Sequence, residues 1–320
     1  MADEPSTLLV GKPDDAPPIA RSGHGSGGLS PFDERMHRWL IGPEGLRAGW
    51  RLLLYAIMAR ALYLLLGVLV HYAMQFGLHG LWLQLFAEAG LVPVAVAPGL
   101  LLASLEGRRF DDYGLPRRAV FGKLFWSGAF WGITAITVLM LGLRGAGAFY
   151  FGPLSLHGLR ILKFAAFWGV FFLLVGVYEE FLSRGYTQFT LRKIVGFWPS
   201  AILLSAGFGA FHLGNPGETW LGILGAALIG FFFCLTLRRT GNLWFAVGFH
   251  AAWDWGESYL YSVPDSGGIS PGHLLKSSFH GNAWLTGGSA GPEGSVLVLV
   301  LMAALWAAFD RVYREVKYPA

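Results

Sequence analysis

Eight long apolar segments dominate this sequence and restrict what it can fold into. Each is about 16–25 residues long, the length that an α-helix needs to cross the hydrocarbon core of a bilayer. They run over 50–73, 81–105, 121–143, 161–182, 198–213, 220–237, 242–258 and 294–310. In lipid only helices and closed barrels satisfy every backbone hydrogen bond, and these segments lack the alternation of barrel strands. We therefore predict an all-α polytopic membrane protein with about eight transmembrane helices.

The composition supports this prediction and excludes other classes. Hydrophobic residues make up 54% of the chain and charged residues 14%, whereas soluble domains carry about 25% charged residues. The net charge of +4 is explained by Lys and Arg in cytosolic loops. We therefore expect membrane lipid as a partner and no nucleic acid. The single cysteine, Cys234, excludes a disulfide within the chain.

Lys and Arg are concentrated in every second connection between the apolar segments. They precede the first segment and follow the second, fourth, sixth and eighth, whereas the other connections hold few. Arg144 and Arg160, which flank the third connection, depart from this alternation. Because Lys and Arg collect on the cytosolic side of a membrane, we predict that both termini are cytosolic.

The chain divides into five predicted stretches. Residues 1–47 are rich in Pro, Gly, Ser and Asp and lack a signal peptide, so we predict a disordered cytosolic tail. Its end, from Pro31 to Leu46, is predicted to form an interfacial helix. The remaining stretches are the N-terminal transmembrane helices (48–158), a catalytic core on helices four to seven (159–258), an extracytosolic loop (259–293), and the last transmembrane helix with a cytosolic C-terminus (294–320).

Three clusters of polar residues lie inside apolar segments. They are Glu179-Glu180 with Arg184, Phe208 with His212, and His250 with Asp254. Ionisable residues at bilayer depth are costly and indicate function. If the fourth helix ends near Arg192, the clusters lie about 15–21 Å from the cytosolic ends of their helices, and hence at similar depth. Carboxylates and imidazoles gathered in this way can activate water.

The spacing within the clusters indicates which residues can pair with one another and which can take part in chemistry. Glu180 and Arg184 are four positions apart, so they share a helix face and can form an ion pair. Glu179 is rotated by about 100° and is free for chemistry. Asp254 shares a face with His250 and can orient its imidazole. Each cluster alone also fits a structural role, but their coincidence favours catalysis.

The order of these motifs on successive apolar helices resembles the CPBP (Abi) family. This family contains type II CAAX prenyl endopeptidases and bacterial bacteriocin-processing or immunity proteins. The run Gly241-Asn242-Leu243-Trp244 before His250 is also similar. The resemblance covers roughly residues 161–258. It implies an intramembrane protease whose helices surround a cavity open to the cytosol, and its bacterial members point to the bacterial inner membrane.

The resemblance also implies a role for each motif residue. Glu179 corresponds to the general base, His212 to the residue that positions water, and His250 with Asp254 to the oxyanion-stabilising pair. Alternatively, a divalent metal such as Zn²⁺ is held by His212, His250, Glu179 and Asp254. Glu180, Arg184 and Phe208 match supporting positions.

One position departs from the CAAX endopeptidases, which commonly have Asn where this chain has Asp254. An ionised Asp would repel an oxyanion. Asp254 must therefore be protonated, orient His250 or bind a metal.

These observations favour an intramembrane endopeptidase that hydrolyses a peptide bond by glutamate-activated water. Its substrates would be membrane-associated peptides or proteins, either prenylated or bacteriocin-like. Two alternatives remain open. The acid and histidine residues would also suit a proton-coupled membrane transporter, and the fold could serve as a non-catalytic immunity or scaffold protein.

Overall fold

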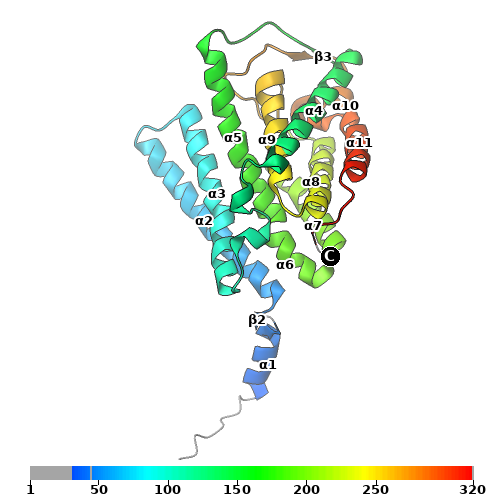
Figure 1. Ribbon diagram of the computed structural model, residues 1–320. Helices are drawn as coiled ribbons and strands as arrows, with labels where there is room; N and C mark the ends of the chain where they lie inside the picture. The colour runs from blue at the N-terminus through cyan, green and yellow to red at the C-terminus, as the bar shows by residue number, and fades with distance from the viewer. Residues whose placement is uncertain (1–30, 44, 319–320) are drawn as a thin grey trace, which may run out of the picture.

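The computed structural model describes residues 31–43 and 45–318 and shows a bundle of helices (Figure 1). Eight helices match the eight apolar segments in order: α2 (Ala48–Gln75), α3 (Gly80–Leu105), α4 (Lys123–Gly145), α5 (Leu159–Arg184), α7 (Phe197–Phe211), α8 (Trp220–Thr240), α9 (Trp244–Asp254) and α11 (Val296–Val312). Five stretches of the described residues are long and apolar enough to cross a membrane. The prediction of an all-α polytopic membrane protein is confirmed.

The two ends of the bundle differ in charge. Helix α1 (Pro31–Leu40), the strands β1 (Ile41–Gly42) and β2 (Gly45–Leu46), and the last described residues lie at one end (Figure 1). The Arg-rich connections between α3 and α4 and between α8 and α9 lie there too, and we call this the basic end. The opposite, distal end holds the connections 146–158, 212–219 and 262–295.

The predicted N-terminal tail is only partly covered by the structure. Residues 1–30 lie outside the described residues. The helix predicted from Pro31 to Leu46 is shorter than expected: it ends at Leu40, and the remainder forms the antiparallel pair of β1 and β2.

Helix α5 ends earlier than the sequence suggested. It stops at Arg184 rather than near Arg192, because Gly185, with φ −81° and ψ −119°, leaves helical geometry. A separate short helix, α6 (Tyr186–Val195), follows. Glu179 therefore lies about 8 Å from the end of its helix, and not about 20 Å as one long helix would require.

Helices α4 and α9 cross with their backbones in direct contact. A Cβ atom on Gly132 of α4 would lie 2.2 Å from the carbonyl oxygen of Phe249, and one on Gly248 of α9 would lie 2.1 Å from that of Phe125. Glycine at such positions is how membrane helices approach closely. The crossing fixes α9, the helix that carries His250.

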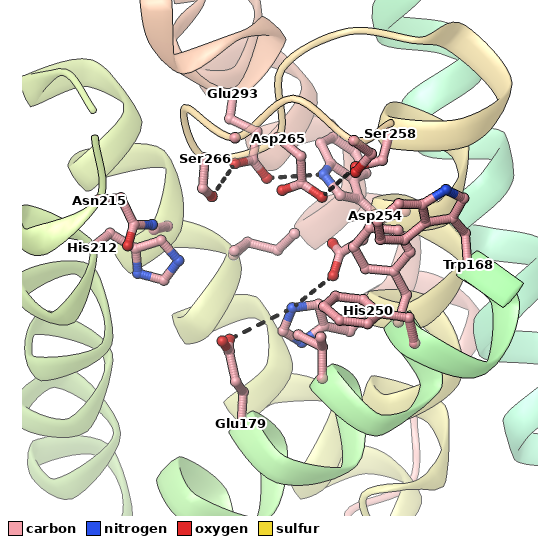
Figure 2. Close-up of a pocket in the computed structure, with 18 of the residues that line it drawn as sticks. Trp168, Glu179, His212, Asn215, His250, Asp254, Ser258, Asp265, Ser266 and Glu293 are labelled. Carbon is pink, nitrogen blue, oxygen red and sulfur yellow. Dashed lines mark hydrogen bonds and ion pairs between the residues drawn. The ribbon is translucent and has the colours of Figure 1, made fainter. Parts of the chain in front are cut away.

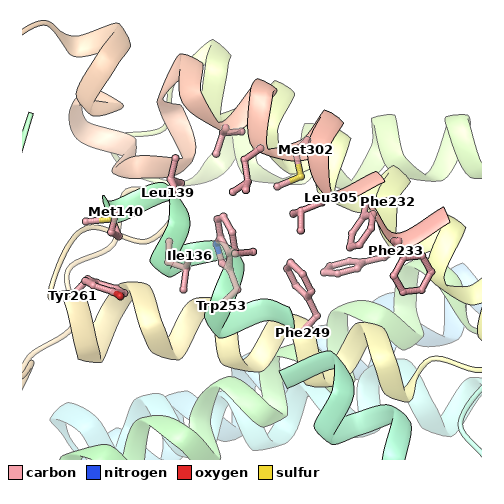
Figure 3. Close-up of a cluster of buried hydrophobic side chains, with 14 of the residues drawn as sticks. Ile136, Leu139, Met140, Phe232, Phe233, Phe249, Trp253, Tyr261, Met302 and Leu305 are labelled. Atoms are coloured by element: carbon pink, nitrogen blue, oxygen red, sulfur yellow. The ribbon is translucent and has the colours of Figure 1, made fainter. Parts of the chain in front are cut away.

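A core of buried side chains surrounds the outer face of this crossing (Figure 3). It lies between α4, α8, α9 and α11, and most of its members are almost fully buried. They include Ile136, Leu139, Met140, Phe232, Phe233, Phe249, Trp253, Met302 and Leu305. The core holds α9 from one side while α5 packs against the other, where Gly176 lies close to the backbone of Val247.

The predicted loop 259–293 is folded onto the distal end of the bundle. Helix α9 continues as a π-helical stretch, η4 (Trp255–Tyr261), before the chain leaves the bundle. The strand β4 (Ser278–Phe279) then pairs antiparallel with β3 (Phe149–Tyr150). The short helix α10 (Ala283–Thr286) and the turn η6 (Pro292–Gly294) lead into α11. These segments form the roof of the site described next.

Candidate active site

A cavity of about 440 Å³ brings the predicted catalytic residues together. Glu179 from α5, His212 from the end of α7, and His250 and Asp254 from α9 all line it (Figure 2). Such a volume is in the range of ligand-binding pockets. Three clusters separated along the chain thus meet in one space, as the sequence analysis expected.

The imidazole of His250 is at the centre of a set of carboxylates. Its Nδ1 lies 3.0 Å from Oε1 of Glu180. Its Nε2 faces the cavity, 3.7 Å from Oε2 of Glu179 and 3.5 Å from Oδ2 of Asp254. Because Glu180 pairs with an arginine, its carboxylate accepts, and Nδ1–H of His250 donates to it. Glu180 therefore orients His250 through Nδ1, which is one of the tasks that the sequence analysis considered for Asp254.

Glu180 belongs to an ion pair that is fully buried in the protein. Nη1 of Arg184 donates to Oε1 of Glu180 at 2.8 Å, and neither side chain is exposed. The guanidinium of Arg184 also lies 4.4 Å from the ring centre of Phe208, within the range of a cation–π contact. Gly230 of α8 makes room for it, because a Cβ there would lie 2.3 Å from Nη2 of Arg184. The three predicted supporting residues thus form one buried unit behind His250.

His212 faces the cavity from the side opposite His250 (Figure 2). It begins a 3-10 turn at the end of α7, and its Nδ1 lies 2.9 Å from the carbonyl oxygen of Phe208. A carbonyl oxygen only accepts, so Nδ1 carries the proton and Nε2 of the neutral ring is an acceptor. The ring of Phe208 contacts both imidazoles, with centres 5.0 Å from His212 and 6.3 Å from His250.

The predicted metal ligands do not converge on one point. Ligands of one Zn²⁺ lie about 2.0–2.2 Å from the ion, and hence within about 4.4 Å of one another. Among the described residues, no three of Glu179, His212, His250 and Asp254 place ligand atoms within 4.8 Å of one another. This arrangement does not fit a shared zinc ion.

A second group of acidic residues lies at the roof, and the sequence analysis missed it. Glu257, Asp265 and Glu293 place carboxylate oxygens within 4.8 Å of one another. Asp265 and Glu293 also line the cavity (Figure 2). Burial and the neighbouring Glu293 carboxylate raise the pKa of Asp265 to about 8. No pattern in the sequence indicated this group, because its members come from the π-helical stretch η4, a loop and the turn η6.

The cavity reaches the distal end of the bundle. Asn215, Ser266, Ile269 and Ser270 line it there, and among the described lining residues none belongs to the connections of the basic end. If the Lys- and Arg-rich end is cytosolic, the cavity opens away from the cytosol. The two expectations of cytosolic termini and a cavity open to the cytosol therefore conflict.

Comparison with known proteins bears on the part of the chain that builds this cavity. Residues 161–256 match the family model of the type II CAAX prenyl endopeptidases, Rce1-like. This segment is thus similar to that family. It runs from α5 into η4 and contains Glu179, His212, His250 and Asp254, and it confirms the resemblance seen in the sequence. No curated protein and no solved structure matches the chain. With five candidate membrane spans among the residues that the structure describes, the protein is an integral membrane protein.

Proposed function

We propose that this protein is an intramembrane endopeptidase in which Glu179 activates water. One observation carries the proposal. Glu179 faces Nε2 of a histidine whose Nδ1 is held by a fully buried ion pair, and all of these residues lie in the segment that matches the Rce1-like family. A base beside a fixed imidazole is an arrangement that hydrolysis needs.

The proposed reaction begins with proton transfer from water to the carboxylate of Glu179. The water oxygen attacks the carbonyl carbon of the peptide bond, and the carbonyl oxygen becomes an oxyanion. Glu179 then passes the proton to the amide nitrogen as the carbon–nitrogen bond breaks. The products are a carboxylic acid and an amine, the remaining acid proton then passes to the amine, and Glu179 is restored as a carboxylate.

The two histidines are assigned different tasks because their environments differ. His250 donates Nδ1–H to Glu180, and the carboxylate of Glu179 beside Nε2 favours a second proton there. Nε2–H then donates to the oxyanion. Nδ1 of His212 is held by the carbonyl oxygen of Phe208, which leaves its Nε2 to hold the attacking water.

Asp254 fits this scheme when it carries a proton. It lies 3.5 Å from Nε2 of His250, where an ionised carboxylate would repel the oxyanion. A protonated Asp254 donates a hydrogen bond, as the Asn of the CAAX endopeptidases would.

The walls of the cavity favour an apolar, membrane-associated peptide. Aromatic side chains of α5, α7 and α8 line it: Trp168, Phe171, Phe172, Phe208 and Phe233. Because the cavity reaches the distal end, the charge distribution favours substrates presented on the non-cytosolic side. A bacteriocin-like or other exported peptide fits this better than a cytosolic prenylated protein.

The proposal is tested with protein purified in detergent and a set of fluorogenic membrane peptides. We expect cleavage by the wild type and none by Glu179→Gln. Proton-coupled uptake into proteoliposomes without cleavage would indicate a transporter instead. Neither cleavage nor uptake would favour a binding or immunity role.

A further inference from the structure

Three carboxylates from separate segments converge above the catalytic residues. Glu257 lies in η4, Asp265 in the loop that follows, and Glu293 in η6 before α11. Their oxygens lie within 4.8 Å of one another. Figure 2 shows Asp265 and Glu293 pointing toward each other at the roof of the cavity.

Glu257 is the decisive member of this group. Its side chain is fully buried, and neither of its carboxylate oxygens has a hydrogen-bond partner in the described structure. The donors nearby are already engaged. The indole N–H of Trp253 donates to Glu293 at 3.0 Å, and the hydroxyl of Ser258 donates to Asp265 at 3.0 Å.

The group also lacks a cationic side chain. Within the described part of the chain, no Lys or Arg forms an ion pair with any of the three carboxylates. A buried carboxylate without a partner is costly, and like charges at this distance repel. Protons or a bound cation must therefore neutralise the group.

We infer that Glu257, Asp265 and Glu293 form a binding site for Ca²⁺. All donors are oxygens, which hard cations prefer, whereas Zn²⁺ and copper favour nitrogen or sulfur. Ca²⁺ binds oxygens at about 2.3–2.6 Å, so ligands up to about 5 Å apart can share one ion. Mg²⁺ is usually held by one or two carboxylates and several waters, so three converging carboxylates favour Ca²⁺.

The ion would fasten the roof of the cavity. Its ligands connect η4, the loop that lines the cavity mouth and the turn η6 that precedes α11. Glu257 follows Asp254 by one helical turn, so the ion would also fix the end of α9. The site is separate from Glu179, His212 and His250, and its occupancy does not depend on the proposed peptidase reaction.

The test measures metal binding directly in the full chain in detergent. Wild-type protein is equilibrated with Ca²⁺, desalted and analysed by inductively coupled plasma mass spectrometry, with Mg²⁺ at equal concentration as the competing ion. We expect about one Ca²⁺ per chain. Thermal unfolding should show a midpoint higher by about 5–10 °C in Ca²⁺ at a hundred times its dissociation constant than in EGTA.

Matched variants locate the ion. Asp265→Asn and Glu293→Gln should lose the bound Ca²⁺ and the Ca²⁺-dependent shift, as should Glu257→Gln. Glu218→Gln, which removes a distal-end carboxylate outside the group, should retain both. If Glu257→Gln fails to fold, the other two variants decide the result. Wild-type protein that binds no Ca²⁺, or binds Mg²⁺ in preference, overturns the inference. So does Ca²⁺ binding that survives in Asp265→Asn and Glu293→Gln.

Discussion

Oε1 of Glu180 accepts hydrogen bonds from both Nη1 of Arg184 and Nδ1 of His250, at 2.8 and 3.0 Å, although His250 lies 70 positions further along the chain. One buried oxygen therefore joins the ion pair of α5 to the imidazole of α9. The two neighbouring glutamates therefore have different roles. Glu180 accepts from Nδ1 of the His250 imidazole inside the protein, whereas Glu179 faces the cavity. The following predictions test that division.

Glu179→Gln should lower peptide hydrolysis by at least about 100-fold, because the amide cannot take a proton from water. The variant should insert and unfold like the wild type, since Glu179 lies at the cavity wall and not in the buried pair. Cleavage rates and thermal unfolding in detergent check both expectations. Retention of more than a few per cent of wild-type activity would remove Glu179 from the role of base.

Glu180→Gln should lower stability as well as activity. The substitution leaves Arg184 as an uncompensated buried charge, which costs about 3–5 kcal/mol. Folded yield and the unfolding midpoint measure this loss. The matched control is Glu315→Gln, because the Glu315–Lys317 pair lies at the surface and should contribute nothing measurable. An unchanged midpoint with reduced turnover would instead make Glu180 a residue that only positions His250.

Asp254→Asn should remain active, with a weaker dependence on pH. An asparagine donates the same hydrogen bond as a protonated aspartic acid and carries no group that titrates. Rates measured across the pH range check this. A loss of about 10–100-fold would be typical of a residue that orients a ligand or a neighbour, and would contradict the proposed role. If a chelator then abolished the activity of the wild type and added metal restored it, the result would favour the alternative in which a metal is bound.

Gly248→Ala should destabilise the protein by about 1–3 kcal/mol, the usual cost of overpacking. The added methyl would lie 2.1 Å from the backbone carbonyl oxygen of Phe125, so α4 would have to move away to make room for it. Gly207→Ala in α7 is the control, because a Cβ added there would have nothing within 4 Å. That change should be neutral or stabilising by up to about 1 kcal/mol. Equal unfolding midpoints for the two variants would argue against the close crossing.

The orientation of the chain can be measured with single cysteines. Ile269→Cys places an exposed thiol at the cavity mouth, and Glu315→Cys places one at the basic end. The native Cys234 is fully buried and should give little background. We expect a membrane-impermeant maleimide to label intact cells only at residue 269. Labelling at residue 315 alone would place the cavity mouth in the cytosol.

The sequence predicted those parts of the fold that depend on local pattern. Hydrophobic runs predicted eight helices in the correct order, and spacings of four predicted the Glu180–Arg184 pair. Contacts between distant segments were not predictable in this way. The bond between Glu180 and His250 depends on how α5 packs against α9. The group around Glu257 depends on the path of a loop that has no repeating pattern. Gly185 ended α5 before Arg192, the end that the depth estimate had assumed.

The backbone contact between α4 and α9 has a consequence for how substrate preference can be changed. Because Gly132 and Gly248 leave no space for side chains, α9 cannot shift to enlarge the cavity without losing its support. New peptide preferences must instead come from the cavity wall, at the mouth residues 268–271 and the aromatic side chains of α5. A combinatorial library confined to those positions would sample specificity while the scaffold beneath His250 stays intact.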